Sequence, residues 1–164
     1  LKFGIEKFCK SAKSADADGL IVVDVPPEED DEIFNATKKN NIDLIKLATP
    51  TTNSERLKKI LKTCSGFLYY VSIKGITGAK SADPKIVKNA INNIKKNTNI
   101  PVAVGFGIKG PKDAAVIANT GCDGIVVGSA LVEIIENSLR KKKSKHNIAQ
   151  KVGSMVKKLR TKLS

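Results

Sequence analysis

Glycines gather at the ends of two consecutive β-rich runs, where they could hold a phosphate group. Gly105-Phe106-Gly107 ends one apolar run, and Gly128-Ser129 ends the next, just before a helical pattern. Glycine lets the backbone approach a ligand closely and adopt left-handed dihedrals that turn successive N–H groups toward one anion. The start of a helix adds free N–H groups and the positive end of its dipole. The two glycine-bearing ends therefore favour a shared phosphate site over two simple tight turns.

The same strand ends hold few groups for proton transfer. His146 is the only histidine and lies in a basic, polar stretch, so a histidine base or triad is excluded there. Asp24 follows an apolar run and could be a base, but a capping or paired carboxylate fits its position equally well. The acidic residues 28–31 are expected to form a solvated helix start. Tyr69 and Tyr70 should face opposite sides of a strand, so an inward Tyr69 could border an aromatic substrate or pack in the core.

The glycine-bearing ends belong to short runs that are rich in β-branched and aromatic residues. The runs are 19–25, 43–50, 66–72, 100–107 and 124–130. Without strict polar alternation, such runs are typical of parallel strands covered on both faces. Helical patterns alternate with them, with candidate N-caps at Asn53 or Ser54 and at Asp83, and with a glycine stop at Gly121.

This alternation predicts an α/β fold with a parallel sheet and right-handed crossovers. An open doubly wound sheet and a (β/α)8 barrel both fit. A complete barrel needs about 250 residues, whereas the chain has 164. Because the chain begins at Leu1 and its only methionine is Met155, we expect an N-terminal part to be missing. Residues 1–164 should then form one domain, the later part of a barrel, with an exposed and apolar sheet edge.

Charge is concentrated near the end of the chain. The net charge is +13, from 29 basic and 16 acidic residues, and residues 137–164 contain no acid. We expect residues 140–164 to form a basic linker and helix with solvated lysines. A nucleic acid is an unlikely partner, because the segment has no Phe, Tyr or Trp that could stack on bases.

Three widely spaced cysteines, Cys9, Cys64 and Cys122, argue against a disulfide framework and a structural zinc site. We expect them to be small core residues in a protein of the reducing cytoplasm. No apolar run reaches the ~18 residues that a transmembrane helix requires. We therefore expect neither a signal peptide nor a membrane partner.

Five segments carry a family resemblance. Residues 67–79 read Phe-Leu-Tyr-Tyr-Val-Ser-Ile-Lys-Gly-Ile-Thr-Gly-Ala, and residues 20–29 read Leu-Ile-Val-Val-Asp-Val-Pro-Pro-Glu-Glu. The other segments are residues 48–56, 101–108 and 124–130. Together they resemble the tryptophan synthase alpha chain family, in the same order and over essentially the whole chain. The resemblance implies strands four to eight of a (β/α)8 TIM barrel with their helices.

The resemblance also implies an activity. The family cleaves indole-3-glycerol phosphate to indole and glyceraldehyde 3-phosphate, a retro-aldol lyase reaction in L-tryptophan biosynthesis that uses no cofactor and no metal. It works in an α2β2 complex in which indole passes to the pyridoxal-phosphate-dependent beta chain. Its two catalytic carboxylates, a glutamate and an aspartate, match positions upstream of Leu1. The chain by itself is therefore expected to be inactive.

Individual roles follow from the matching positions. The resemblance implies substrate-phosphate binding by the backbone N–H groups of Gly78, Gly107, Gly128 and Ser129. It implies an indole pocket bordered by Tyr69, Phe106, Leu47 and Ile21. Thr77 would help to close the site over the substrate, and Asp24 and Pro26 would face the beta chain.

Two other interpretations stay open. A different phosphate-binding barrel, such as a sugar-phosphate isomerase or epimerase or an indole-glycerol-phosphate synthase, would share the glycine-bearing ends but should lack the segment 67–79. A basic nucleic-acid-binding protein would use residues 140–164 and should bind tightly even in salt, whereas solvated lysines give weak, steeply salt-dependent binding.

Overall fold

The computed structural model describes residues 2–72, 83–105, 107–142 and 144–162, and its strands and helices alternate. The strands are β1 (Gly19–Ile21), β2 (Asp43–Ala48), β3 (Leu68–Val71), β4 (Val102–Gly105) and β5 (Gly124–Val126). The helices are α1 (Ile5–Ser14), α2 (Asp31–Lys39), α3 (Ser54–Thr63), α4 (Pro84–Lys95), α5 (Pro111–Ala118), α6 (Ser129–Arg140) and α7 (Lys145–Arg160). Each predicted strand region contains one strand.

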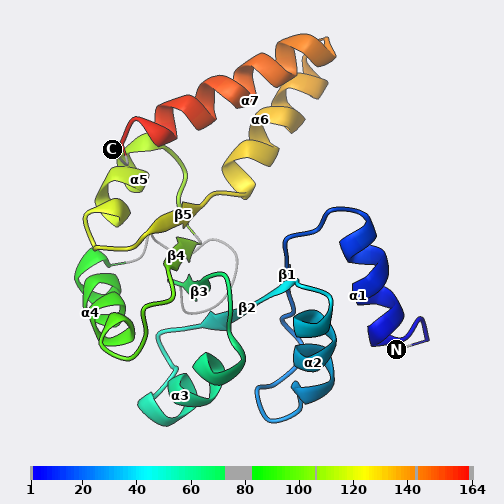
Figure 1. The fold of residues 1–164 in the computed structure, drawn as a ribbon. Helices are drawn as coiled ribbons and strands as arrows, with labels where there is room; N and C mark the ends of the chain where they lie inside the picture. The colour runs from blue at the N-terminus through cyan, green and yellow to red at the C-terminus, as the bar shows by residue number, and fades with distance from the viewer. Residues whose placement is uncertain (1, 73–82, 106, 143, 163–164) are drawn as a thin grey trace.

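The five strands form one parallel sheet in the order β1-β2-β3-β4-β5, so each strand pairs with its neighbours in sequence. The strands follow an arc, and α2 to α5 lie on its outer side (Figure 1). Within the described part of the chain no further strand joins β1 to β5, so the arc stays open. This architecture confirms the predicted α/β fold, a parallel half-barrel with helices on its convex face.

The main core lies between the convex face of the sheet and the helices. Alternate strand positions such as Leu68, Tyr70 and Val102 are almost fully buried, and they pack with side chains of α3, α4 and α5. Leu159 of α7 joins the same cluster. A smaller cluster around Cys9 joins α1 and α2 to the start of the sheet. The burial alternates along β3, as expected for a strand with one face against helices.

Local capping signals place the helix starts. The Asn53 side chain accepts a hydrogen bond from the Arg56 N–H at 2.8 Å, and Asp83 accepts one from the Lys85 N–H at 2.9 Å. Each bond satisfies one of the N–H groups that lack a partner inside the helix. Asn53, rather than Ser54, is therefore the cap of α3, and the prediction for Asp83 is confirmed.

All five predicted strands are longer than the observed ones, and the first and last of them show why. The run 19–25 forms a strand only over Gly19–Ile21, which pairs with Asp43–Ile45 of β2, and the loop toward α2 begins directly after Ile21. The run 124–130 ends as a strand at Val126, since Ser129 already begins α6. Apolar composition alone does not show where a neighbouring strand stops.

The expected solvated helix start is wrong for Asp30. Residues 26–29 form a turn and α2 begins only at Asp31. Asp30 is 1% exposed and forms an ion pair with Lys46 of β2, which is itself buried. Lys46 lies on the helix-covered face of β2. Its buried ammonium group requires a counter-charge, and the Asp30 carboxylate provides it.

Both ends of the sheet expose apolar side chains. Ile21 and Val23, at the β1 end, are 50% and 68% exposed. Beyond β5, Val132 and Leu139 of α6 are 61% and 60% exposed. The prediction of an exposed, apolar sheet edge is confirmed at the β1 end, and beyond β5 it is helix α6 that exposes apolar side chains.

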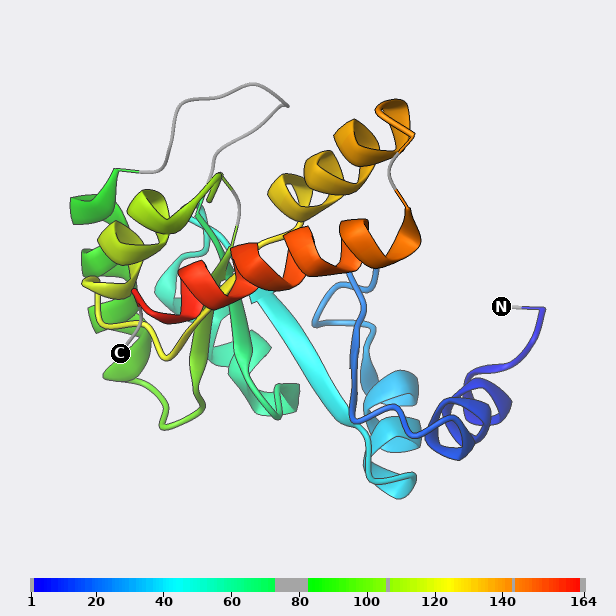
Figure 2. The same ribbon diagram turned by 90° about the horizontal axis from the view of Figure 1, so that it is seen from above.

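The C-terminal segment is mostly helical. α6 and α7 lie side by side as a helical pair, and α7 also packs against α5 (Figure 2). The Ser144 side chain caps α7, so His146 lies in the helix rather than in the expected linker, next to Gln150. Among the helices that the structure describes, none combines the length and the hydropathy needed to cross a membrane.

The cysteines behave as core residues. Cys9 and Cys64 are buried, Cys122 is half-buried, and all three are free thiols. Burial raises the pKa of each thiol above its ordinary value. Their predicted role in packing is confirmed for Cys9 and Cys64, which belong to the two core clusters.

Candidate functional site at the carboxyl ends of the strands

On the concave face of the sheet, residues of four neighbouring strands lie side by side in the strand register. The register pairs Leu47 with Tyr69, Tyr69 with Ala103, and Ala103 with Gly124. Because side chains alternate along a strand, this row faces away from the buried Tyr70. Tyr69 therefore faces the concave side, as the alternation along the strand predicted, and only the small Ala103 and Gly124 follow it in this row toward β5.

The Tyr69 ring extends over Gly105, toward the carboxyl end of β4. A Cβ on Gly105 would lie 2.2 Å from Tyr69 Oη and 2.4 Å from Tyr69 Cε2, closer than atoms can approach. A side chain at this position would therefore require the Tyr69 ring to move, because the ring occupies the space. Burial raises the pKa of the Tyr69 phenol above its ordinary value.

Replacing Gly105 by alanine is expected to displace the Tyr69 ring and to lower the free energy of unfolding by about 1–3 kcal/mol. The chain has two tyrosines and no tryptophan, so in a Tyr70→Phe background tyrosine fluorescence reports on Tyr69 alone. Gly124→Ala is the matched control, because its Cβ would meet the Ala103 Cβ at an ordinary 3.8 Å. Identical spectra and stabilities for the two alanine variants would contradict the expected clash.

Gly107 and Gly128 occupy equivalent positions beyond adjacent strands. Gly105 pairs with Val126, and each glycine follows its strand residue by two positions. Gly107 has a φ of +77°, in the left-handed region that favours glycine. Gly128 is the N-cap residue of α6, and a Cβ placed on it would meet no atom within 4 Å. The space in front of Gly128 is therefore open.

This end of the sheet can bind an anion through its backbone. The Gly128 carbonyl accepts the Leu131 N–H at 2.9 Å, which begins the hydrogen bonding of α6. The N–H groups of Ser129 and Ala130 come too early in α6 to have an acceptor within the helix, and the helix dipole makes this terminus positive. Gly128 and Ser129 are exposed. Together with the left-handed turn at Gly107, the arrangement suits the oxygens of a phosphate.

Three of the predicted site positions lie outside the described residues: Thr77, Gly78 and Phe106. The last described residue before the first two is Ser72. Its Oγ donates a hydrogen bond to the Gly105 carbonyl at 2.8 Å, and its N–H donates to the same oxygen at 3.1 Å. These bonds tie the carboxyl ends of β3 and β4 together.

The remaining predicted positions lie at the β1 end. Ile21 pairs with Ile45 on the concave face, at the edge of the sheet. Asp24 is exposed in the loop after β1, and Pro26 begins a turn that the Glu29 N–H closes on the Pro26 carbonyl at 3.0 Å. An exposed loop at the edge of a sheet is suited to contact with another protein.

The fold agrees with the comparisons to known proteins. The family model for the tryptophan synthase alpha chain matches residues 1–163. The chain belongs to the tryptophan synthase alpha chain family. The resemblance drawn from five short segments is thereby confirmed over nearly the whole chain.

Solved structures of the family have the same fold. The alpha subunit from Legionella pneumophila str. Paris matches with a TM-score of 0.85 and 34% identity, over 99% of this chain and 58% of that chain. The alpha subunit from Campylobacter jejuni matches at 0.79 and 34% identity, over 96% and 60%. A chain of the tryptophan synthase α2β2 complex from Pyrococcus furiosus matches at 0.80 and 33% identity, over 96% and 61%. This chain thus spans about three fifths of these relatives.

The sequence interpretation missed Lys46, whose side chain is 5% exposed in its ion pair with Asp30. The signal was present, because a lysine lies inside the otherwise apolar run 44–48. A charged side chain on the helix-covered face of a strand requires a counter-charge from a neighbouring element. Which acidic residue provides it depends on the path of the loop after β1, which the sequence does not specify.

Proposed function

We propose that this chain forms the phosphate- and indole-binding part of a tryptophan synthase alpha chain, which cleaves indole-3-glycerol phosphate to indole and glyceraldehyde 3-phosphate. The observation that carries the proposal is the pair of equivalent glycines at the carboxyl ends of β4 and β5. Gly107 has a left-handed backbone, and Gly128 begins α6. Such a pair suits a substrate that is anchored by its phosphate group. Membership of the family supports the lyase class of the reaction.

In this proposal the backbone holds the substrate phosphate. The N–H groups of Gly107, Gly128 and Ser129 donate to its oxygens, together with the N–H of Gly78. Backbone donors at a helix terminus are already oriented, so little reorganisation is needed when the anion binds. Thr77 would then help to close the site over the bound substrate.

The concave face holds the indole ring. Tyr69 and Leu47 are neighbours in the sheet register, and Ile21 lies toward the β1 edge of the same face. Phe106 would complete the border of the pocket. The small side chains beside Tyr69 leave room for a flat ring, which suits a bicyclic aromatic group.

The reaction itself needs two proton transfers. One group must protonate the indole carbon, and another must remove the proton of the glycerol hydroxyl. We assign both to the glutamate and aspartate that the family carries upstream of the matched region. The residues of this chain then bind and orient the substrate between them.

A beta chain is the proposed partner, and Asp24 and Pro26 are its proposed contact points. Both lie in the exposed loop after β1. The relative from Pyrococcus furiosus is part of an α2β2 complex, which supports the same assembly here. In such an assembly indole would pass directly to the pyridoxal-phosphate-dependent beta chain.

The function can be tested with a chimera in which the segment that precedes the matched region in the Legionella pneumophila relative is joined to this chain. The exposed apolar residues at both ends of the sheet would be covered by that segment. We expect the chimera to release indole from indole-3-glycerol phosphate, faster when a beta chain is added. A folded chimera that binds neither substrate nor beta chain would refute the proposal.

A further inference from the structure

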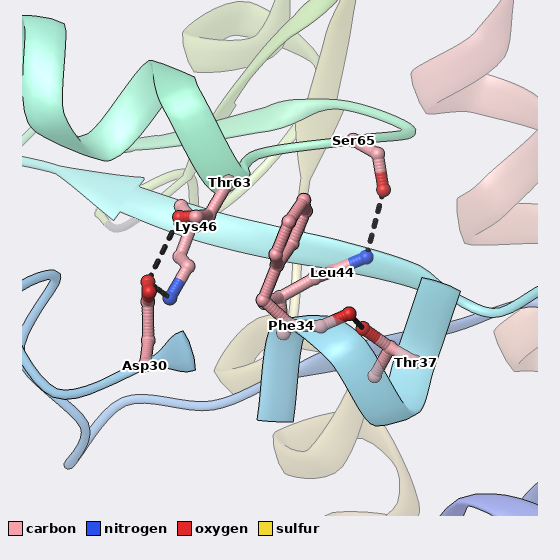
Figure 3. A network of polar contacts seen from close by, with 7 residues as sticks. All are labelled: Asp30, Phe34, Thr37, Leu44, Lys46, Thr63 and Ser65. Carbon is pink, nitrogen blue, oxygen red and sulfur yellow. Dashed lines mark hydrogen bonds and ion pairs between the residues drawn. The ribbon is translucent and has the colours of Figure 1, made fainter. Parts of the chain in front are cut away.

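Asp30 occupies the N-cap position of α2 without capping the helix. An aspartate there usually accepts a hydrogen bond from the second or third N–H of the helix. The Asp30 side chain makes no such bond. Its Oδ2 instead accepts from Lys46 Nζ and, at 2.8 Å, from Thr63 Oγ1, while its Oδ1 has no partner among the described residues. The carboxylate is thus turned away from α2 and into the protein (Figure 3).

Three elements meet at this carboxylate. Asp30 precedes α2, Lys46 lies in β2 and Thr63 ends α3 (Figure 3). The side chains of Asp30 and Lys46 are 0% and 5% exposed, so both charges have lost their hydration. Apolar residues of similar volume would often be equally stable or more stable at such a place. A buried pair of this kind therefore selects one arrangement of the chain more than it adds stability.

The arrangement that it selects is the path of the loop 22–29. The loop leaves β1 and must bring Asp30 against Lys46 before α2 can begin. On the outer side of the loop, Glu28 Oε1 makes only exposed ion pairs, 3.3 Å from Lys59 Nζ and 3.6 Å from Arg56 Nη1 on α3. The turn that starts at Pro26 joins this part of the loop to the exposed residues Val23 and Asp24.

We propose that Asp30 and Lys46 are positioning residues that hold the loop 22–29, and with it Asp24 and Pro26, in the conformation on which a partner chain docks. This inference rests on the proposed function for the identity of the partner, a tryptophan synthase beta chain. The loop is the only connection between β1 and α2, so a fixed Asp30 limits how far Asp24 can move. A preformed loop also lowers the ordering cost of association.

The test removes both charges without leaving either unpaired. In the double variant Asp30→Asn/Lys46→Met, the amide oxygen can still accept from Thr63, and methionine fills most of the volume of the lysine. Lys46→Met alone leaves a buried carboxylate without a counter-ion and is expected to be destabilised, and the double variant is expected to regain most of that loss. Glu28→Gln is the matched control, because it breaks only exposed ion pairs on the same loop.

Two measurements on the chain and its chimera decide the inference. In the double variant, hydrogen exchange over residues 22–29 should become about tenfold faster or more, while amides of β2 and α3 keep their protection. Binding of the beta chain should weaken by about tenfold. Unchanged exchange in the loop, or faster exchange with undiminished binding, would overturn the inference. Absence of beta-chain binding by the unmodified chimera would count against the proposed function, while the exchange rates would still decide whether the pair holds the loop.

Discussion

The 164-residue chain assayed by itself should release indole from indole-3-glycerol phosphate on the order of 10⁴-fold more slowly than the chimera described above. The reason is that the described strand ends offer few side chains that could act as a general acid or base. Asp24 is one carboxylate in an exposed loop, and Asp113 in the first turn of α5 already accepts the Lys109 N–H at 2.9 Å. His146 lies on α7 beside Gln150 rather than at a strand end.

One carboxylate cannot easily act at both ends of the reacting system. A positioned general acid or base typically contributes about 10²–10⁴ in rate, so the loss of two costs about 10⁴-fold or more. The open arc adds a second deficit, because a substrate held only by its phosphate would rotate freely in water. Orientation of the reacting groups is itself a large part of enzymatic rate enhancement.

The assay measures indole from the purified chain with and without a beta chain, at equal protein concentration to the chimera. Circular dichroism and binding of glycerol phosphate should show that the chain is folded in the same samples. Turnover comparable to that of the chimera would contradict the prediction, and it would place the acid–base groups within this chain.

Much of the fold could be predicted because it depends on local signals. The parallel order follows from strands that alternate with helices, and the helix starts follow from caps such as Asn53 and Asp83. The equivalent positions of Gly107 and Gly128 after adjacent strands also follow from the sequence, and their role in phosphate binding stays a prediction. The facing of Tyr69 follows from the two-residue period of a strand.

The remainder depends on contacts between distant residues. β1 extends only as far as its pairing with Asp43–Ile45 of β2, and no property of residues 19–25 shows where that pairing ends. The pairing of Asp30 with Lys46 joins positions on two elements, and Thr63 adds a third. Acidic residues at a helix start are usually solvated, and only the three-dimensional path of the loop shows that one of them is buried.

A second large effect is expected at Gly128. Gly128→Val should lower kcat/KM of the chimera for indole-3-glycerol phosphate on the order of 100-fold, as expected for loss of two charge-assisted hydrogen bonds. The added side chain would occupy the open space in front of the α6 N–H groups, where a Cβ meets no described atom beyond its chain neighbours within 4 Å. The melting temperature should fall only slightly, because valine is a poorer N-cap residue than glycine but displaces no described side chain. Ser129→Ala keeps its N–H and should cost less than about threefold by the same reasoning.

Gly107→Val should act in the same direction, but its effect has two parts. The left-handed backbone strains any residue with a Cβ, and the same Cβ would also enter the phosphate space. Gly121→Val separates these parts, because Gly121 has a similar φ of +86°, with no atom within 4 Å of an added Cβ, at the other end of α5. We expect both variants to lose comparable stability and only Gly107→Val to lose substrate affinity. Equal losses of kcat/KM for Gly128→Val and Ser129→Ala would instead show that the Ser129 hydroxyl, and not the backbone, binds the phosphate.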